Sequence, residues 1–368
     1  MTSVRARRLA VFLLILALGA AAGSAVAPAL ATARPAPGHA QAARPAPGHP
    51  QAGRALAGRA QAASGWLARQ MTRGSHFVAV LDGVTYPDQG LTIDAIFAFA
   101  ATGSANGFGA RAVSWLERPG ILSNYIGNGT TESYAGATAK VALAAEVRGL
   151  NPARFGKVNL LARLARLLKP SGRYSDHSRY GDYSNAFSQS LAIIALSRHS
   201  RAPAKAVSFL VSTECKNGGY PLDFAQKTCA SDADATAMDV QALLAAGRVR
   251  PAERGLAWLE HAQRGNGGFG STPGAVPNAN STGLAGEAFA VGRWFHRAAR
   301  AKKFLVSLQV GCSGKTGHRG AIAYDMTGFT RSTATSATAQ GILGLADVGL
   351  AQLTSRGAHR SDPRLECS

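Results

Sequence analysis

From Ser64 onward, the apolar positions repeat with a long period. Six similar helical phrases each contain one large apolar anchor, namely Trp66, Trp115, Leu164, Phe209, Trp258 and Phe304. The intervals between these anchors are 49, 49, 45, 49 and 46 residues. A period of about 48 residues indicates an array of structural repeats that pack on their neighbours.

Each anchor phrase is followed by a glycine-rich turn and then by a second, alanine-rich phrase, such as Asp94–Ala100 or Gln241–Ala246. The turn aromatics are Phe77, Tyr125, Tyr174, Tyr220, Phe269 and, after an insertion, Tyr324. The second phrase is apolar around most of a helix and predicts a buried inner helix, whereas the first phrase carries charges and predicts an outer one. We therefore expect an all-α, (α/α)6 toroid of six two-helix repeats over residues 63–350, followed by a C-terminal tail over residues 351–368.

The N-terminal region predicts an exported protein. Three arginines precede an apolar run from Leu9 to Ala22, and small-residue cleavage patterns follow up to Ala33, so residues 1–33 read as a signal peptide. Residues 34–62 contain a decapeptide repeat rich in proline, alanine and glycine, which predicts an extended, disordered linker. No later apolar stretch has membrane-spanning length, so we expect a secreted mature protein, with the cell wall as an alternative location.

The chain is strongly basic, with 40 Lys and Arg against 20 Asp and Glu and a formal net charge of +20. Such a charge permits binding to an anionic cell-wall polymer. The basic residues are scattered along the chain without an aromatic-interleaved stripe, so nucleic acid is not an expected partner.

The four cysteines predict two disulfides, because exported proteins use paired cysteines and neither pair has the spacing of a zinc knuckle. Cys215 and Cys229 flank one loop, which leaves Cys312 and Cys367 for each other. The histidines show no paired metal spacing, so we predict neither a metal site nor a cofactor.

The phrase from Gln263 to Phe269 resembles the glycine-rich repeat motif of the prenyltransferase and squalene-cyclase superfamily, and Glu214–Tyr220 is similar, with Glu in place of Gln. With six repeats over residues 63–350, the chain looks like the secreted prenyltransferase/squalene oxidase repeat proteins. This resemblance implies the terpenoid-cyclase type of α/α toroid. The same ring serves enzymes and binding proteins, so the resemblance does not fix an activity.

The phrase Asp232–Ala237 resembles the acidic motif of class II terpene cyclases, in which Asp234 would be the general acid and Asp232 its neighbour. Ala235 replaces one supporting carboxylate, and the chain has no room for the second helical domain that such cyclases use. The alternative is helix N-capping, which similar phrases at Asn278–Thr282 and Ser332–Thr335 favour.

Several side chains are candidates for the rim of a central concavity: Tyr125, Tyr174, Tyr220, Phe224, Phe269, Asn280 and Tyr324. For most of the turn aromatics, packing beneath their own turn is the favoured alternative, because a position repeated in every unit usually serves the architecture.

The sequence favours a non-enzymatic, exported toroid that binds a hydrophobic small molecule or a cell-envelope partner in its centre. The alternatives are a terpene-cyclase-like lyase or isomerase that uses Asp234, and a structural spacer or adhesin. Repeats four to six carry the clearest motifs, so we expect a functional side to lie in the C-terminal half.

Overall fold

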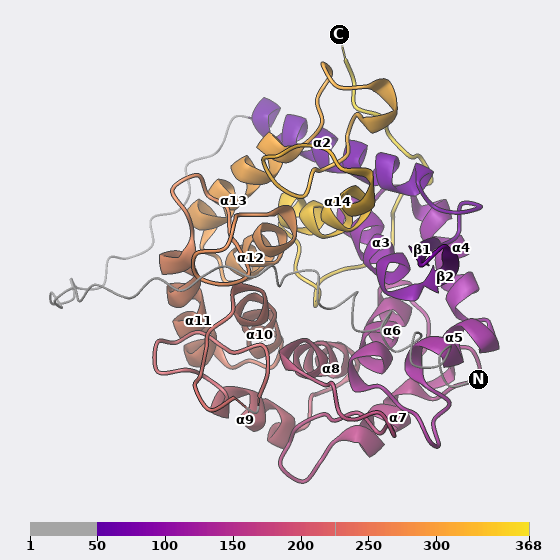
Figure 1. Cartoon of the computed structure of the whole chain (residues 1–368), viewed down its shortest axis with the longest axis vertical. Coiled ribbons are helices and arrows are strands. Elements are labelled where there is room, and N and C mark those ends of the chain that lie inside the picture. Colours follow the sequence, from indigo (N-terminus) through magenta and orange to yellow (C-terminus); the bar gives the residue numbers. More distant parts are fainter. Residues whose placement is uncertain (1–49, 225, 368) are drawn as a thin grey trace, which may run out of the picture. The chain divides into compact units, whose positions relative to one another are not determined.

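The computed structural model describes residues 50–224 and 226–367, with side chains from residue 56 onward. The predicted signal peptide and most of the predicted linker lie outside these residues. From Arg54 onward the chain forms one compact unit, which is a ring of helices (Figure 1).

Six of the described helices form the inner ring: α3 (Gln89–Thr102), α6 (Ala135–Val147), α8 (Ala186–His199), α10 (Ala233–Ala245), α12 (Ala279–Val291) and α14 (Arg331–Ala346). Each inner helix contacts the next, and α14 contacts α3, so the ring is closed. This arrangement confirms the predicted (α/α)6 toroid.

The outer layer surrounds this ring. Its helices are α2 (Pro50–Arg69), α4 (Asn106–Leu116), α5 (Pro119–Ile126), α7 (Leu160–Leu167), α9 (Ala204–Ser212), α11 (Val249–Ala262) and α13 (Phe295–Leu308). Outer helices bury one face only. In α7, for example, Leu160, Leu164 and Leu167 are buried at spacings of four and three residues, while Arg166 is exposed.

Small residues allow the inner helices to approach closely. A Cβ atom added to Gly283 of α12 would lie 2.4 Å from the carbonyl oxygen of Gln340 in α14. A Cβ atom on Gly344 would lie 2.9 Å from the Cα of Gly283. The two helices therefore touch through their backbones, which only glycine permits at these positions.

Hydrogen bonds join each repeat to the next. The amide Nε2 of Gln263 donates to Gly267 O in its own turn and to Arg297 O in α13, both at 3.1 Å. Gln309 similarly donates to Gly320 O at 3.1 Å and to Arg59 O at 2.9 Å, which links the last repeat to α2. The glutamine of the recognised repeat motif thus has a structural role in closing the ring.

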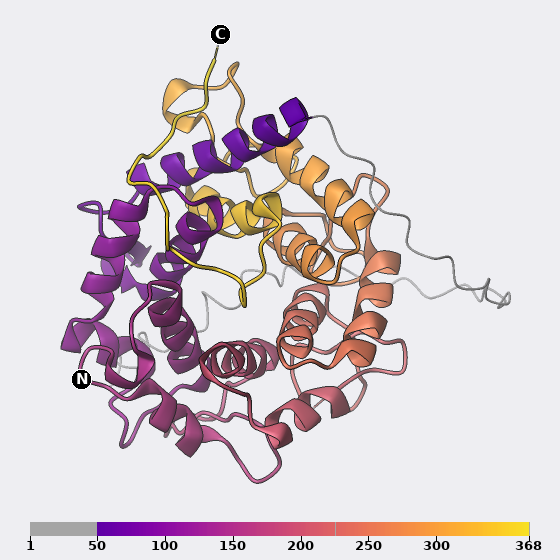
Figure 2. The same ribbon diagram turned by 180° about the vertical axis from the view of Figure 1, so that it is seen from behind.

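The C-terminal segment crosses one end of the ring (Figure 2). We call residues 349–362 the strap. The N–H groups of Ser355 and His359 donate to the carbonyls of Val147 and Gly103, which lie at the ends of α6 and α3. Leu353, within the strap, is fully buried. The strap therefore covers the end of the ring at which the inner helices finish.

Both predicted disulfides are present. Cys215 pairs with Cys229 and Cys312 pairs with Cys367, with Cα–Cα distances of 5.5 Å in each case. The second disulfide fixes the chain beyond the strap to the segment that follows α13. Among the described residues, no helix combines the length and apolarity needed to cross a membrane.

The predicted extended linker ends earlier than residue 62, because α2 is helical from Pro50. The first two decapeptide copies contain several prolines, but the third copy, Gly53–Ala62, contains none. Ala60 and Ala62 are buried in the ring. Loss of proline allows a helix here, and burial of the alanines stabilises it.

Repeats one and two differ from the expected helix–turn–helix pattern. In repeat one, the connection contains an antiparallel hairpin of β1 (Phe77–Leu81) and β2 (Val84–Asp88). In repeat two, Tyr125 lies in α5 and not in a glycine turn. Pro119 occupies the first position of α5, where proline favours a new helix.

Candidate functional site

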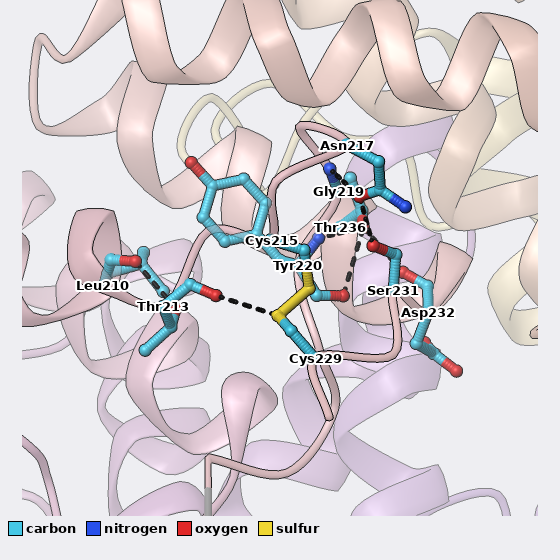
Figure 3. Close-up of a disulfide and its surroundings, with 10 residues drawn as sticks. All are labelled: Leu210, Thr213, Cys215, Asn217, Gly219, Tyr220, Cys229, Ser231, Asp232 and Thr236. Atoms are coloured by element: carbon cyan, nitrogen blue, oxygen red, sulfur yellow. Dashed lines mark hydrogen bonds between the residues drawn. A yellow bond between two sulfur atoms is a disulfide. The ribbon is translucent and has the colours of Figure 1, made fainter. Parts of the chain in front are cut away.

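The start of α10 shows which residues of the Asp232–Ala237 phrase the fold uses. Asp232 is the N-cap, and its carboxylate accepts a hydrogen bond from Ala235 N at 2.8 Å. Thr236 Oγ1 accepts from Tyr220 N at 2.9 Å and thereby fixes the preceding turn (Figure 3). The capping interpretation is thus confirmed for Asp232, and Thr236, the fourth helical residue (N4), has a structural role as well.

The same two contacts recur around the ring. Side chains cap α3, α8 and α12 at Asp88, Asn185 and Asn278. N4 side chains accept from a turn N–H in four further repeats, at Thr92, Gln189, Thr282 and, in the aligned position of α14, Thr338. The cap predicted at Ser332–Thr335 is wrong, because α14 begins earlier, at Arg331, and its N-cap Thr330 makes no side-chain cap.

The second helical residue (N2) lies between the N-cap and the N4 residue. Its side chain neither caps the helix nor anchors the preceding turn. The N2 residues are Gly90, Gly136, Phe187, Asp234, Asn280 and, aligned through Thr338, Ser336. Asp234 and Asn280 belong to neighbouring helices, and each has a buried Oδ1 without a hydrogen-bond partner among the described residues. A polar oxygen that is buried without a partner is costly, and these two are the N2 side chains for which this holds among the described residues.

The environment of Asp234 favours its protonated form. Burial raises the pKa of Asp234, the nearby Asp232 carboxylate raises it further, and a hydrogen bond with Ser281 opposes this rise. Burial also raises the pKa of Asp232, against the hydrogen bond from Ala235. Asp234 can therefore hold a proton near neutral pH, as a general acid must.

Two further sets of inner-helix residues follow the N2 residues along the same helix faces. The first set lies four positions after N2, and the second lies seven positions after N2. Residues four positions later lie on the same helix face. They are Asp94, Lys140, Leu191, Met238, Leu284 and, aligned in α14, Gln340, which we call the N6 layer. Lys140 Nζ lies 2.6 Å from Asp94 Oδ1, and each side chain is 19% exposed, so side chains do not completely fill this part of the ring.

Seven positions after N2, Gln241 and Glu287 form a polar pair beside the strap. Gln241 Nε2 donates to Glu287 Oε2 at 3.1 Å, and Gln241 Oε1 accepts from Leu350 N at 3.0 Å. Glu287 is fully buried, and burial raises its pKa to about 8. This contact shows that Gln241 faces the backbone of the strap at Leu350.

The structure corrects three of the seven predicted rim residues. Tyr174, Tyr220 and Phe269 are at most 1% exposed and pack beneath their own turns. Their predicted place at a rim is therefore wrong, and the architectural interpretation holds. Tyr324 is half-buried, and its backbone accepts from Ala279 N, but the last turn is anchored through Ile322 and not through Tyr324.

The remaining rim candidates lie in different surroundings. Phe224 is half-buried and packs edge-on against Phe209, with ring centroids 5.1 Å apart. Tyr125 is half-buried close to Lys140, and burial raises its pKa to about 12. Asn280 has a buried Oδ1 without a hydrogen-bond partner among the described residues. The Asp234 carboxylate contributes to the raised pKa of Tyr324, so this predicted rim residue lies near Asp234.

The sequence interpretation missed Asp94, Lys140, Gln241 and Glu287 as interior residues. Their signal is visible in retrospect: each is a polar or charged residue inside an alanine-rich phrase that predicts a buried helix. A charged side chain in such a helix is expensive unless it is paired or functional.

The closed double layer of helices defines the α/α-toroid class. Three solved structures share the fold across about four-fifths of this chain. Type II terpene cyclase MstE from Scytonema has a TM-score of 0.58 and 14% identity, with 80% of this chain and 98% of that chain covered. Unsaturated glucuronyl hydrolase from Bacillus sp. GL1 has a TM-score of 0.54 and 10% identity, with 79% and 96% covered.

The third similar structure is a protein from Actinoplanes, with a TM-score of 0.57 and 15% identity over 79% of this chain and 99% of that chain. No protein-family model and no curated protein matches the sequence. The predicted terpenoid-cyclase type of toroid is thus confirmed as a fold. Membership of the secreted repeat proteins stays a prediction.

The comparison also corrects one argument against a cyclase. The ring described here covers nearly the whole MstE chain, so a type II terpene cyclase can consist of one ring. The lack of room for a second helical domain therefore does not exclude cyclase chemistry.

Proposed function

We propose that this protein is an acid-catalysing enzyme that protonates a small unsaturated substrate inside its ring, with Asp234 as the proton donor. The observation that carries the proposal is the unpartnered, buried Oδ1 of Asp234 beside a second carboxylate. This replaces the non-enzymatic function favoured by the sequence, because neither oxygen of Asp234 is used to cap α10.

The chemistry requires one proton transfer. The O–H bond of the protonated Asp234 breaks and a C–H bond forms on a carbon–carbon double bond, which leaves a carbocation. That cation closes a ring or shifts, and then loses a proton or gains water, which makes the enzyme a lyase, isomerase or hydratase. The Asp234 carboxylate then regains a proton from solvent.

The names of the similar structures support this substrate class. One MstE structure is described with geranylgeranyl dihydroxybenzoate as substrate, and the Bacillus enzyme is named for unsaturated glucuronyl groups. Both molecules contain carbon–carbon double bonds. Within the N6 layer, three residues are apolar, namely Leu191, Met238 and Leu284, which suits the apolar part of such a substrate.

The test is incubation of the protein in D2O with geranylgeranyl dihydroxybenzoate and, separately, with an unsaturated glucuronyl disaccharide. Mass spectrometry should find deuterium on carbon in the product from wild type and none from Asp234→Asn. The exposed Asp82→Asn variant is the control and should behave like wild type. Loss of deuterium incorporation without a lower melting temperature would identify Asp234 as the acid; equal incorporation in both variants would refute it.

A binding protein for a hydrophobic small molecule is the second candidate, and the apolar Leu191, Met238 and Leu284 surface favours it. In that case native mass spectrometry would find a bound ligand. After incubation in D2O, the released ligand would be chemically unchanged and would carry no deuterium on carbon. Binding to an anionic cell-wall polymer and a role as spacer or adhesin stay predictions.

We also propose that the mature protein is exported. The two disulfides support an oxidising location. N-terminal sequencing of the protein recovered from culture medium tests this, since cleavage near Ala33 is expected.

A further inference from the structure

Trp258 in α11 differs from the other anchor residues of the repeats. Five of the six anchors are covered, either because the side chain is at most 2% exposed or because an aromatic ring packs against it. The two buried anchors are Leu164 and Phe304, and the three packed against a ring are Trp66, Trp115 and Phe209. Trp258 is half-buried, and no aromatic ring covers it among the described residues.

Trp258 lines a cavity of about 270 Å³ between α11 and the turn of the fourth repeat, residues 214–220. Lys216, Asn217 and His261 also line this cavity, and all three are exposed. Pockets for small molecules begin at about 300 Å³, so this cavity suits a single ring of a small molecule or of a polymer.

The turn of the fifth repeat packs on α13 in the same way, but an arginine covers it. A Cβ atom on Gly218 would lie 3.1 Å from Arg254 O, and a Cβ atom on Gly267 would lie 2.3 Å from Arg300 O. Arg254 and Arg300 therefore occupy equivalent positions. Arg300 Nη2 donates to two carbonyls of the turn, at 3.0 and 2.9 Å.

The difference between the two turns follows from one residue of the repeat motif. Gln263 donates its amide to Gly267 O and Arg297 O. Its equivalent, Glu214, has no N–H group to donate and instead accepts from Arg254 Nε at 2.5 Å and Nη2 at 2.7 Å. The Arg254 donor that would reach the turn carbonyls is thus bound to a carboxylate, which leaves this turn uncovered.

The groups around the indole ring of Trp258 are mainly hydrogen-bond donors. Asn217 Oδ1 accepts from Gly219 N at 3.1 Å and from Ser231 Oγ at 2.7 Å (Figure 3). The amide Nδ2 of Asn217 and the indole N–H of Trp258 have no acceptor among the described residues. Lys216 forms no ion pair in the same part of the chain. A ligand here must therefore supply acceptors and a flat apolar face.

We propose that this cavity binds one residue of an acidic saccharide, which is a sugar ring that carries a carboxylate. The C–H face of the sugar packs on Trp258, as an aromatic ring with a polar edge permits. Hydroxyl oxygens accept from Trp258 Nε1 and Asn217 Nδ2, and the carboxylate pairs with Lys216.

A carboxylate fits this cavity better than a phosphate does. Phosphate groups bind most readily at helix N-termini. The residues of α11 that line the cavity run from Arg254 to His261 and exclude the first turn of that helix, which begins at Val249. The site also lies on the outer layer of helices, so this inference goes beyond the function proposed for the interior of the ring.

The test is isothermal titration calorimetry of the whole protein with tetragalacturonate. Cellotetraose is the control that has sugar rings without charge, and tetraglutamate is the control that has charge without sugar rings. We expect tetragalacturonate to bind at least about tenfold more tightly than either control. Equally tight binding of tetraglutamate would indicate attraction by net charge alone, and equally tight binding of cellotetraose would remove the role of the carboxylate. Either result would overturn the proposal.

Variants assign the binding to the cavity. Trp258→Leu and Lys216→Ala should each weaken binding of tetragalacturonate about tenfold, because they remove the stacking surface and the cation. Leucine is the anchor residue of the third repeat, and melting temperatures check that each variant folds. Lys315→Ala, in the segment after the other disulfide-bonded cysteine, is the matched control and should bind like wild type. Unchanged binding in both cavity variants would overturn the proposal.

Glu214→Gln separates this site from a general attraction between opposite charges. The substitution removes a negative charge beside the cavity, so attraction by charge alone would become stronger. We expect the opposite result: Arg254, once released, should cover its turn as Arg300 does, and binding should weaken about tenfold. Unchanged or tighter binding would overturn the proposal. Asp234→Asn should bind tetragalacturonate like wild type, whatever the outcome of the deuterium experiment.

Discussion

Gln241 connects the buried carboxyl group of Glu287 to the strap. Its amide donates to Glu287 Oε2 at 3.1 Å and its carbonyl accepts from the backbone of the strap at Leu350. Donation from the Gln241 amide favours the ionised carboxylate, whereas burial of Glu287 favours the protonated form and outweighs that effect. The protonation state of Glu287 should therefore affect how stably the strap is held.

The first prediction concerns the pH dependence that Glu287 gives to stability. Burial raises its pKa from 4.5 to about 8, so above pH 4.5 the unfolded chain loses a proton that the folded chain keeps. Stability should fall as pH rises from about 5 to about 8, by on the order of a few kcal/mol from this group. Urea unfolding of wild type and Glu287→Gln at pH 5 and pH 8 measures it.

Glu287→Gln should lose less stability over this range than wild type does. The exposed Glu253→Gln variant is the control and should keep the wild-type pH dependence. An equal loss of stability in Glu287→Gln and wild type would contradict the buried, protonated carboxyl group.

The second prediction concerns the turn anchor at Thr236. Thr236→Val preserves side-chain shape but leaves Tyr220 N–H without its acceptor in a buried position. The expected loss of unfolding free energy is about 1–3 kcal/mol. Thr228→Val, in an exposed loop, should change it by less than about 0.5 kcal/mol. A matching small effect at both positions would show that another group or water satisfies Tyr220 N–H.

The third prediction concerns the close contact of α12 and α14. Gly283→Ala places a Cβ atom 2.4 Å from Gln340 O, so the two helices must separate. We expect a loss of about 1–3 kcal/mol in unfolding free energy, measured by chemical denaturation. Gly58→Ala in α2, where no atom lies within 4 Å, should instead stabilise the protein by about 0.5–1 kcal/mol. A neutral Gly283→Ala would mean that the inner ring can expand locally.

The fourth prediction concerns the Cys312–Cys367 disulfide, which spans 55 residues and holds the end of the strap. Replacing both cysteines with serine should lower unfolding free energy by about 4 kcal/mol on the chain-entropy model, and should expose the strap to proteolysis. Mass spectrometry of limited digests locates the cut sites. The matched Cys215→Ser, Cys229→Ser pair, with a separation of 14 residues, should leave the strap protected. Equal protection of the strap in both variants would contradict its dependence on the disulfide.

The ring itself could be predicted from the sequence, because the anchor positions repeat regularly and an alanine-rich phrase indicates burial on every face. Local departures could not be predicted with the same rule. Pro119 starts an additional helix and removes Tyr125 from its expected turn. In the last repeat the aromatic pattern indicates Tyr324, whereas the buried Ile322 makes the turn contact. In the first case the backbone preference of proline outweighed the repeat pattern.

The candidate site was only partly predictable for a different reason. Asp232, Asp234 and Asn280 are close in sequence to recognisable helix starts, so their level in the ring follows from the repeat. Lys140 and Asp94 are 46 residues apart and meet only because α3 and α6 pack side by side. Contacts between side chains of different repeats depend on the curvature and closure of the ring, which cannot be derived from the repeat period.

The position of the strap sets an order of assembly. Residues 349–362 follow every ring helix along the chain, so during synthesis the walls of the ring are complete before the segment that covers one end is available. Until then, the inner faces of α6, α8 and α10 are reachable from both ends. A molecule bound during folding can therefore enter from the end that the strap later crosses.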